Sequence, residues 1–481
     1  MLSVPRSSVT LSAFFLVSTA IIHAMPGAAA GPEDVAVHPS FELVQARPAD
    51  FRPKVAGMDW LPGGRLALAT WQPNEVYVLL GADGPADKMS PRKIADGFAD
   101  IMGLCVSGDT IFLADQTGIW SLVDKDKDGL PETRSEVGKL PYTGTFHEWS
   151  FGLLRKDGRF YTALSVGTNR TGRTLSPQKD NRRGSVISMD DRGALEIVAT
   201  GLRAPEGLGW GPEGALFATD NQGSWLPASK LIHVVQGRAY GHKIDPPGLY
   251  DSLFPSPPAV WLPYGEVSKS PTQPVMAVAG PYQGQMFYGD IATGAVRRVF
   301  LDKVGGEWQG GVVRFSAGFE AAVHRLLVGK DGSLWLGGLG NGDQQNWGWH
   351  GKRWGLQRLK PNGKETFEIK AARARAGGFE IEFTSRPGSG ALDPERWTAR
   401  RWWYEPTSAY GGPKKDQALC RIVSARPSQD GLRVFLGVEG LEVYHVIHVR
   451  LNGVRSQSGS ELWTPEFWYT LNSLSTEPFR P

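Results

Sequence analysis

The eight residues Pro212-Glu-Gly-Ala-Leu-Phe-Ala-Thr place a glycine-containing turn directly before a run of alternating apolar residues. Such a turn is the strongest short-range signal for a β-hairpin, and the alternation behind it predicts a half-buried strand. The pattern recurs five more times along the chain. The other copies begin at Pro62, Ser107, Lys156, Gln283 and Lys330.

The spacing of these hairpins predicts one repeat architecture. The turn glycines are 45 to 70 residues apart, which suits four-stranded units, and they are Gly63, Gly108, Gly158, Gly214, Gly284 and Gly332. Six such units predict an all-β fold, a six-bladed β-propeller over residues 40–363. The 60 Gly and 34 Pro among 481 residues fit short strands and many turns. An assortment of unrelated hairpins is the alternative, and the regularity of six copies argues against it.

The repeat ends after Arg358, and a different β pattern follows. Alternating runs such as Phe379-Glu-Ile-Glu-Phe and Tyr444-His-Val-Ile-His-Val carry no hairpin signature of the first kind. They predict a small antiparallel β-sandwich over residues 366–475. Its aromatic cluster suits either a carbohydrate platform or, more commonly, a core or an interdomain contact. The cluster consists of Trp397, Trp402, Trp403 and Tyr404.

Two further stretches are expected near a binding site. The long fourth interval, from Ile244 to Pro274, is rich in Pro, which cannot donate within a β-ladder, so a loop over the site face is expected. The pair Trp347 and Trp349 follows a Gly-rich run and suits stacking on a sugar.

The first thirty residues predict a signal peptide. Arg6 precedes an apolar stretch, Leu11 to Ala24, and small residues end the segment at Ala30. No later run is apolar enough to span a membrane, so we expect a periplasmic or secreted protein. Only Cys105 and Cys420 are present, which excludes a CxxCH haem site and a Cys-based zinc site, and a disulfide between them stays open.

Charge limits the classes of partner. Lys and Arg number 52 against 49 Asp and Glu, a formal charge of +3. This balance argues against an electrostatic nucleic-acid binder. We therefore expect no nucleic-acid partner.

Four motifs carry a family resemblance. They are His147-Glu-Trp-Ser-Phe-Gly-Leu, Gly201-Leu-Arg-Ala-Pro-Glu-Gly-Leu, Thr219-Asp-Asn-Gln-Gly and Gly289-Asp-Ile-Ala-Thr-Gly. Together they resemble the glucose/sorbosone dehydrogenase superfamily, the soluble pyrroloquinoline quinone (PQQ)-dependent sugar dehydrogenases with six-bladed propellers. The chain is most similar to a subgroup of large secreted bacterial proteins with a C-terminal β domain.

The resemblance implies a site at the top of the propeller, where characterised relatives hold the quinone partly through calcium. His147 matches the base that takes the proton of the sugar C1 hydroxyl, and Glu148 is expected to orient it or to act as an acid. Arg203 matches the arginine at the quinone oxygens, and Arg325 matches another cofactor-binding arginine. Asp220 and Asn221 occupy the calcium and cofactor position. The alternatives are a structural histidine for His147 and a buttress of the inner strand for Arg203.

The chain departs from the relatives at three positions. Ala204 stands where they have Asn, Ala292 where they have Lys, and Val323 where they have the first of two Args. Fewer cations weaken the expected binding of a tricarboxylate cofactor, because buried carboxylates need partners.

A separate acidic run predicts a calcium loop. The segment Asp124-Lys-Asp126-Lys-Asp128-Gly129 alternates carboxylates, with Gly at the sixth place, and Glu132 is a candidate ninth-position ligand. Ser135 replaces the Glu of a standard EF-hand. The alternative is a solvated acidic hairpin tip.

Three functions remain open from the sequence. The first is oxidation of a sugar or related alcohol, with electrons passed to an external carrier, since no haem motif is present. The second is a cofactor-independent glycan lyase or hydrolase that uses His147, Glu148 and Glu206 as acid and base. The third is a non-catalytic carbohydrate- or protein-binding propeller, because fold alone does not fix function.

Overall fold

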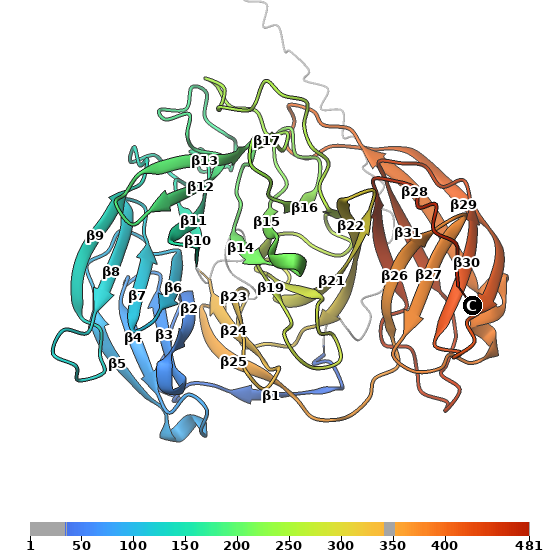
Figure 1. Ribbon diagram of the computed structural model, residues 1–481, viewed down its shortest axis with the longest axis horizontal. Helices are drawn as coiled ribbons and strands as arrows, with labels where there is room; N and C mark the ends of the chain where they lie inside the picture. Colours follow the sequence, from blue (N-terminus) through green and yellow to red (C-terminus); the bar gives the residue numbers. More distant parts are fainter. Residues whose placement is uncertain (1–33, 35, 341–351, 481) are drawn as a thin grey trace, which may run out of the picture.

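The computed structural model describes residue 34, residues 36–340 and residues 352–480 of the chain (Figure 1). The expected signal peptide and the pair Trp347 and Trp349 lie outside the described residues. Secondary structure in the described part is β-strand with short 3-10 turns, and none of it is α-helix. The turns include Pro62–Gly64, Ala86–Lys88, Pro212–Gly214, Ser389–Leu392 and Pro394–Arg396.

The first three quarters of the chain form six sheets. The first contains β2 (Val55–Leu61), β3 (Arg65–Thr70), β4 (Val76–Leu80) and β5 (Ser90–Ala95). The second contains β6 (Gly103–Ser107), β7 (Thr110–Ala114), β8 (Gly118–Val123) and β9 (Thr133–Lys139). The third contains β10 (Ser150–Lys156), β11 (Arg159–Leu164), β12 (Ser185–Asp190), β13 (Leu195–Thr200) and β17 (Arg238–Ala239). The fourth contains β14 (Gly207–Trp210), β15 (Leu216–Asp220), β16 (Ser229–His233) and β18 (Val260–Leu262).

The last two blades complete the ring. The fifth contains β19 (Pro271–Met276), β20 (Met286–Asp290), β21 (Ala295–Val304) and β22 (Glu307–Ser316). The sixth contains β23 (Val323–Val328), β24 (Leu334–Leu339), β25 (Trp354–Pro361) and, as its outer strand, β1 (Phe41–Gln45). The pairing of β1 with β25 joins the N-terminal end of the propeller to its last blade, which closes the ring (Figure 1).

The six inner strands surround one axial channel. Each of β2, β6, β10, β14, β19 and β23 contacts the next in a closed circle, and residues of all six line a cavity of about 310 Å³ at the end where these strands finish. The turn glycines predicted from the sequence all lie between the first and second strands of their sheets, and all have positive φ. This arrangement confirms the predicted all-β class and the propeller.

The Pro-rich interval is only partly loop. Pro271 and Pro274 belong to β19, the inner strand of the fifth blade, rather than to a loop as expected. The strand pairs with β20 alone, and its register shifts between the two prolines. Its other edge faces the channel, where a missing N–H removes no ladder hydrogen bond, and this explains why proline is tolerated there.

The C-terminal domain contains seven antiparallel strands. They are β26 (Ile369–Arg375), β27 (Gly378–Phe383), β28 (Trp397–Tyr404), β29 (Lys414–Pro427), β30 (Arg433–Glu439), β31 (His445–Leu451) and β32 (Glu466–Leu471). The long β29 pairs with β28 through its first half and with β30 through its second, and side chains from both halves share one core.

The C-terminal domain is not a separate body. Its strand β32 pairs with β22, the outer strand of the fifth blade, so one sheet runs from the propeller through the domain (Figure 1). Trp402 and Tyr404 pack with apolar residues of the fourth and fifth blades, and Trp397 lies in the core of the domain. The aromatic cluster is therefore core and interdomain contact rather than a carbohydrate platform, with Trp403 alone at the surface. Cys105 and Cys420 are free and lie in different parts of the fold.

A buried arginine ties four blades together inside the channel. Arg325 of β23 donates from Nε to the Ala56 carbonyl at 2.7 Å and from Nη1 to the Glu206 carbonyl at 2.8 Å, and its Nη2 donates to the Met102 carbonyl. These carbonyls belong to residues at or just before the start of β2, β14 and β6. Inner strands expose such carbonyls to the channel, and a planar guanidinium satisfies several at once.

We expect Arg325→Met to lower the stability of the propeller by about 3 kcal/mol or more, because it leaves buried carbonyls without donors. Thermal unfolding followed by circular dichroism measures this. The matched control is Arg421→Met, since Arg421 forms an exposed ion pair with Glu439. Equal midpoints for the two variants would contradict the role assigned to Arg325.

Candidate functional site

The candidate site lies at the end of the channel where the inner strands begin. The loops that enter β10 and β14 and the loops that leave β11 and β15 meet on this face, opposite the turn glycines. His147 is in the loop before β10, and Arg203 is in the turn before β14. These two residues are close enough for the Arg203 charge to act on the imidazole.

His147 is held as a neutral imidazole. Its φ of 73° is in the left-handed region, which is uncommon for residues other than glycine and often marks a functional constraint. The Nδ1 atom lies 3.4 Å from the Val166 carbonyl, and the ring packs edge-on against Trp149. Burial, then the positive charge of Arg203, lowers the pKa of His147 to about 3. When Nδ1 carries the proton, Nε2 is the basic atom of the site.

Glu148 does not orient His147. The carboxylate is buried and accepts hydrogen bonds from the Thr143 N–H at 2.8 Å and from the Thr143 hydroxyl, with the Thr145 N–H at 3.4 Å. It therefore closes the loop that leads to the histidine. The expected acid or orienting role is replaced by a structural one, because the loop's own N–H groups need an acceptor once buried.

Arg203 is fixed by backbone carbonyls and by an aromatic ring. Nη1 donates to the Gln222 carbonyl at 3.0 Å, and Nη2 donates to the Gly172 carbonyl. The guanidinium lies 5.0 Å from the ring centroid of Tyr410. Its buried Nε has no hydrogen-bond partner among the described residues. A Cβ at Gly223 would come within 2.1 Å of the arginine Cδ, so the arginine requires glycine there.

The Asp220 carboxylate braces the loop before β14. Its carboxylate accepts from the Ala204 N–H at 2.9 Å and from the Arg203 N–H at 3.2 Å. Asp115, directly after β7, and Asp290, at the end of β20, accept backbone N–H groups in the same way. The repetition shows that an aspartate at this position accepts backbone N–H groups of its own blade. In the sequence it follows Ala114, Thr219 and Gly289.

Asn221 and Glu206 form a buried polar pair next to Arg203. Asn221 donates from Nδ2 to Glu206 Oε1 at 2.7 Å and to the Ser270 hydroxyl at 3.2 Å. Asn221 Oδ1 and Glu206 Oε2 are buried, and neither has a partner in the described part of the chain. Burial raises the pKa of Glu206 to about 8. The carboxyl group is thus protonated at neutral pH and able to donate.

Arg325, an expected site residue, and His242 are both enclosed. Arg325 is 1% exposed and directs its donors to the carbonyls of the channel, so the expected cofactor contact stays a prediction that these hydrogen bonds do not support. His242 lies between the Ser224 carbonyl, 2.8 Å from Nδ1, and the Thr174 hydroxyl, 3.2 Å from Nε2. That histidine braces neighbouring loops.

The predicted calcium loop brings its four carboxylates together. One oxygen from each of Asp124, Asp126, Asp128 and Glu132 lies within 4.8 Å of the others. The Gly129 N–H donates to Asp124 Oδ2 at 2.8 Å, which folds the loop around the cluster. The loop joins β8 to β9 at the outer edge of the second blade.

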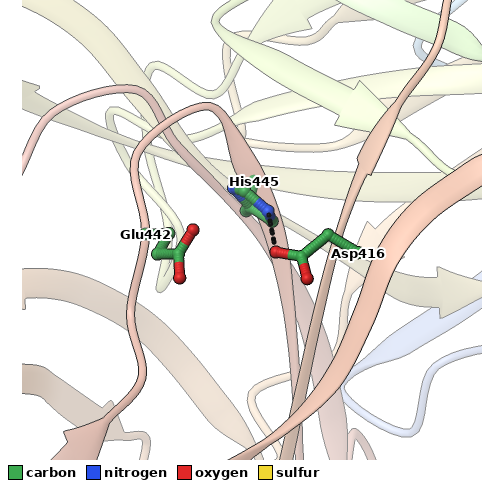
Figure 2. Close-up of side chains that lie close together, drawn as sticks. All are labelled: Asp416, Glu442 and His445. Atoms are coloured by element: carbon green, nitrogen blue, oxygen red, sulfur yellow. Dashed lines mark hydrogen bonds and ion pairs between the residues drawn. The ribbon is translucent and has the colours of Figure 1, made fainter.

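A second cluster, in the C-terminal domain, carries its own countercharge. Figure 2 shows His445 hydrogen-bonded to Asp416, with Glu442 beside them. Arg401 forms ion pairs with both Asp416 and Glu442. A guanidinium between the two carboxylates opposes binding of a cation, so this cluster is an ion-pair network.

Comparisons with known proteins place the propeller among solved structures. No family model matches the chain, and no curated protein matches it in sequence. A structure titled a putative oxidoreductase (glucose dehydrogenase) from Thermus thermophilus is 16% identical, with a TM-score of 0.50 over 66% of this chain and 99% of that chain.

Two further structures have similar coverage. One titled glucose dehydrogenase is 15% identical, with a TM-score of 0.50 over 67% of this chain and all of that one. The PQQ-bound aldose sugar dehydrogenase from Streptomyces coelicolor is 16% identical, with a TM-score of 0.49 over 67% and 99% of the two chains. The chain therefore shares the propeller fold of the glucose dehydrogenase structures, as the sequence resemblance implied.

Proposed function

We propose that the protein oxidises a sugar or a related alcohol at the top of the propeller channel, with PQQ as hydride acceptor and a separate carrier for the electrons. The observation that carries this proposal is His147, a neutral and half-buried base beside Arg203 on the face where the inner strands begin. The propeller fold shared with glucose dehydrogenase structures supports the same reaction class.

The residues fit the quinone through fewer contacts than the resemblance implied. Arg203 Nε is a buried donor without a partner among the described residues, so it is the group that would hold a carbonyl oxygen of the ligand, and the unpartnered acceptor Asn221 Oδ1 would take an N–H or O–H group of it. Arg325 and Asp220 are engaged elsewhere. With Ala204, Ala292 and Val323 in place of polar or cationic residues, we expect PQQ to bind mainly through Arg203.

The proton chemistry belongs to His147. A bound quinone supplies the acceptor for the hydride of the substrate C–H bond. The hydroxyl proton of the same carbon passes to Nε2 of His147, and the C–O single bond becomes a carbonyl. Arg203 opposes charge on the imidazolium that results, so the proton is passed on readily to solvent or carrier.

A second candidate function needs no cofactor. Glu206 is protonated at neutral pH, and His147 is neutral, so the site holds an acid and a base at once. This pairing supports the glycan lyase or hydrolase considered from the sequence, and the experiment below separates the two functions.

We propose that the leader at residues 1–30 exports the protein to the periplasm or beyond. The described residues contain no helix long and apolar enough to cross a membrane. The leader itself lies outside the described part of the chain.

Quinone titration tests the leading function. The protein is loaded with PQQ in the presence of calcium and assayed for dye reduction on a panel of sugars and polyols. We expect quinone-dependent reduction, a loss of about a hundredfold or more in His147→Asn, and normal folding of that variant. Arg203→Ala should weaken quinone binding, measured by fluorescence quenching. Cleavage of a glycan without quinone would favour the second function. Absence of dye reduction in the presence of PQQ on every substrate of the panel would refute the first.

The pH dependence of stability tests the protonation of Glu206. Its pKa is raised above the unfolded value, so the folded state keeps a proton that the unfolded chain loses between pH 4.5 and 8. The free energy of unfolding should therefore fall across this window, by on the order of a few kcal/mol. Glu206→Gln should flatten this decline, seen as thermal midpoints at pH 5 and 8, whereas the exposed Glu365→Gln should keep it. An unchanged decline in Glu206→Gln would contradict the assignment.

We propose that the loop from Asp124 to Glu132 binds calcium as a brace for the second blade, supported by the closeness of its four carboxylates. Millimolar calcium should raise the thermal midpoint of the wild type, because ligand that binds only the folded state stabilises it. Asp126→Asn should abolish the rise. Asp416→Asn, in the ion-pair cluster of Figure 2, is the control and should keep it. A rise that survives Asp126→Asn places calcium elsewhere.

A further inference from the structure

A loop of the C-terminal domain reaches the candidate site. The β28–β29 loop, residues 405–413, joins strands of the domain yet makes backbone hydrogen bonds with the propeller. The Trp225 N–H donates to the Thr407 carbonyl at 2.6 Å, and the Gly411 N–H donates to the Gly223 carbonyl at 3.0 Å. The propeller segment that it meets follows β15, the strand that ends at Asp220. The two domains therefore share this edge of the site.

The loop is shaped for this contact. Gly411 has a φ of 78°, which a residue with a side chain rarely adopts. A Cβ at Gly412 would lie 2.5 Å from Pro227 Cβ, and the Gly412 N–H donates to the Pro227 carbonyl at 3.1 Å. Two consecutive glycines thus let the backbones approach closely. The contact is specific rather than incidental.

The loop carries one exposed aromatic side chain to the site. Tyr410 forms a bridge with Ser224, and its ring lies 5.0 Å from the guanidinium of Arg203. A Cβ at Gly172 would meet Tyr410 Cε2 at 3.8 Å, so the ring also borders the loop after β11. Despite these contacts 53% of Tyr410 is exposed. One part of the ring holds the arginine, and the remainder is open to a ligand.

Tyr410 is not alone at this edge. Tyr264, in the loop before β19, is 48% exposed and lies near Tyr410, and burial, then its neighbours, raises the pKa of its phenol. Phe146, next to His147, is 51% exposed. Large aromatic side chains are costly to expose, and several around one site mark a surface that binds a partner.

We propose that Tyr410 forms a subsite for a sugar unit adjacent to the reacting one, so that the C-terminal domain makes the enzyme prefer oligosaccharides over monosaccharides. This inference rests on the proposed sugar-oxidising function. A tyrosine ring offers an apolar face to the C–H groups of a pyranose and a hydroxyl to its polar edge. Arg203 relates Tyr410 to His147, because its guanidinium lies against the Tyr410 ring and its charge acts on the His147 imidazole.

Calorimetric binding without quinone tests the subsite separately from the oxidation. The probes are cello-, xylo-, malto- and chito-oligosaccharides from the monosaccharide to the hexasaccharide, titrated into the full chain. We expect one series to bind, with its longer members tighter than the monosaccharide. Tyr410→Ala should weaken binding of the oligosaccharide by about tenfold and that of the monosaccharide by less, because the ring also packs on Arg203. Tyr410→Phe should keep most of the affinity, since the stacking face remains.

Two further variants complete the experiment. Tyr444→Ala removes another exposed tyrosine of the same domain and should bind like the wild type. Gly412→Ala should displace the loop and reproduce the loss seen in Tyr410→Ala. The subsite is refuted if no series binds, if length has no effect, or if Tyr410→Ala binds the oligosaccharide as tightly as the wild type. Length-dependent binding through Tyr410 without quinone-dependent dye reduction would retain the subsite and reject the oxidation.

Discussion

The guanidinium of Arg325 is the interaction on which the channel depends. Six inner strands arranged in a ring turn part of their backbone toward the axis, where no neighbouring strand can satisfy it. Arg325 reaches carbonyls at the start of three other inner strands and so links four blades. One of these carbonyls belongs to Glu206, whose side chain is part of the candidate site. The hydrogen bond that closes the channel therefore also positions the floor of the site.

The sequence predicts the propeller well because the signals are local. Gly158 follows Asp157 in a tight turn, and the apolar alternation of β11 comes directly after it, so both halves of a hairpin can be recognised within a short stretch. The strand β19 is missed because its tolerance of Pro271 and Pro274 depends on a free edge facing the channel, which is a property of the closed ring. The joint between β22 and β32 is missed for the same reason, since nothing local distinguishes a strand that pairs across domains.

The site is predicted less completely because polar residues of the same type do different work. Asp220 has the chemistry of a ligand, yet it accepts the N–H groups of its own blade, as Asp115 and Asp290 do. An aspartate that recurs at the same place in several blades is more simply explained as structural than as a site residue. The repeated hairpins show this recurrence at Asp115, Asp220 and Asp290. Glu206 is harder to assess from sequence, because its raised pKa comes from burial in the assembled channel.

The place of Arg203 follows from both domains at once. Gly223 makes room for its side chain, the Gly172 and Gln222 carbonyls accept its hydrogen bonds, and Tyr410 covers its face. Of these, Arg203, Gln222 and Gly223 lie in the motifs recognised from the sequence, whereas Gly172 and Tyr410 do not. Without Tyr410, the Arg203 guanidinium would keep its hydrogen bonds to the backbone carbonyls and lose its contact with the tyrosine ring. The position of the guanidinium would then be less fixed, while the propeller stayed intact. The C-terminal domain thus contacts the guanidinium whose charge, together with the larger effect of burial, lowers the pKa of His147.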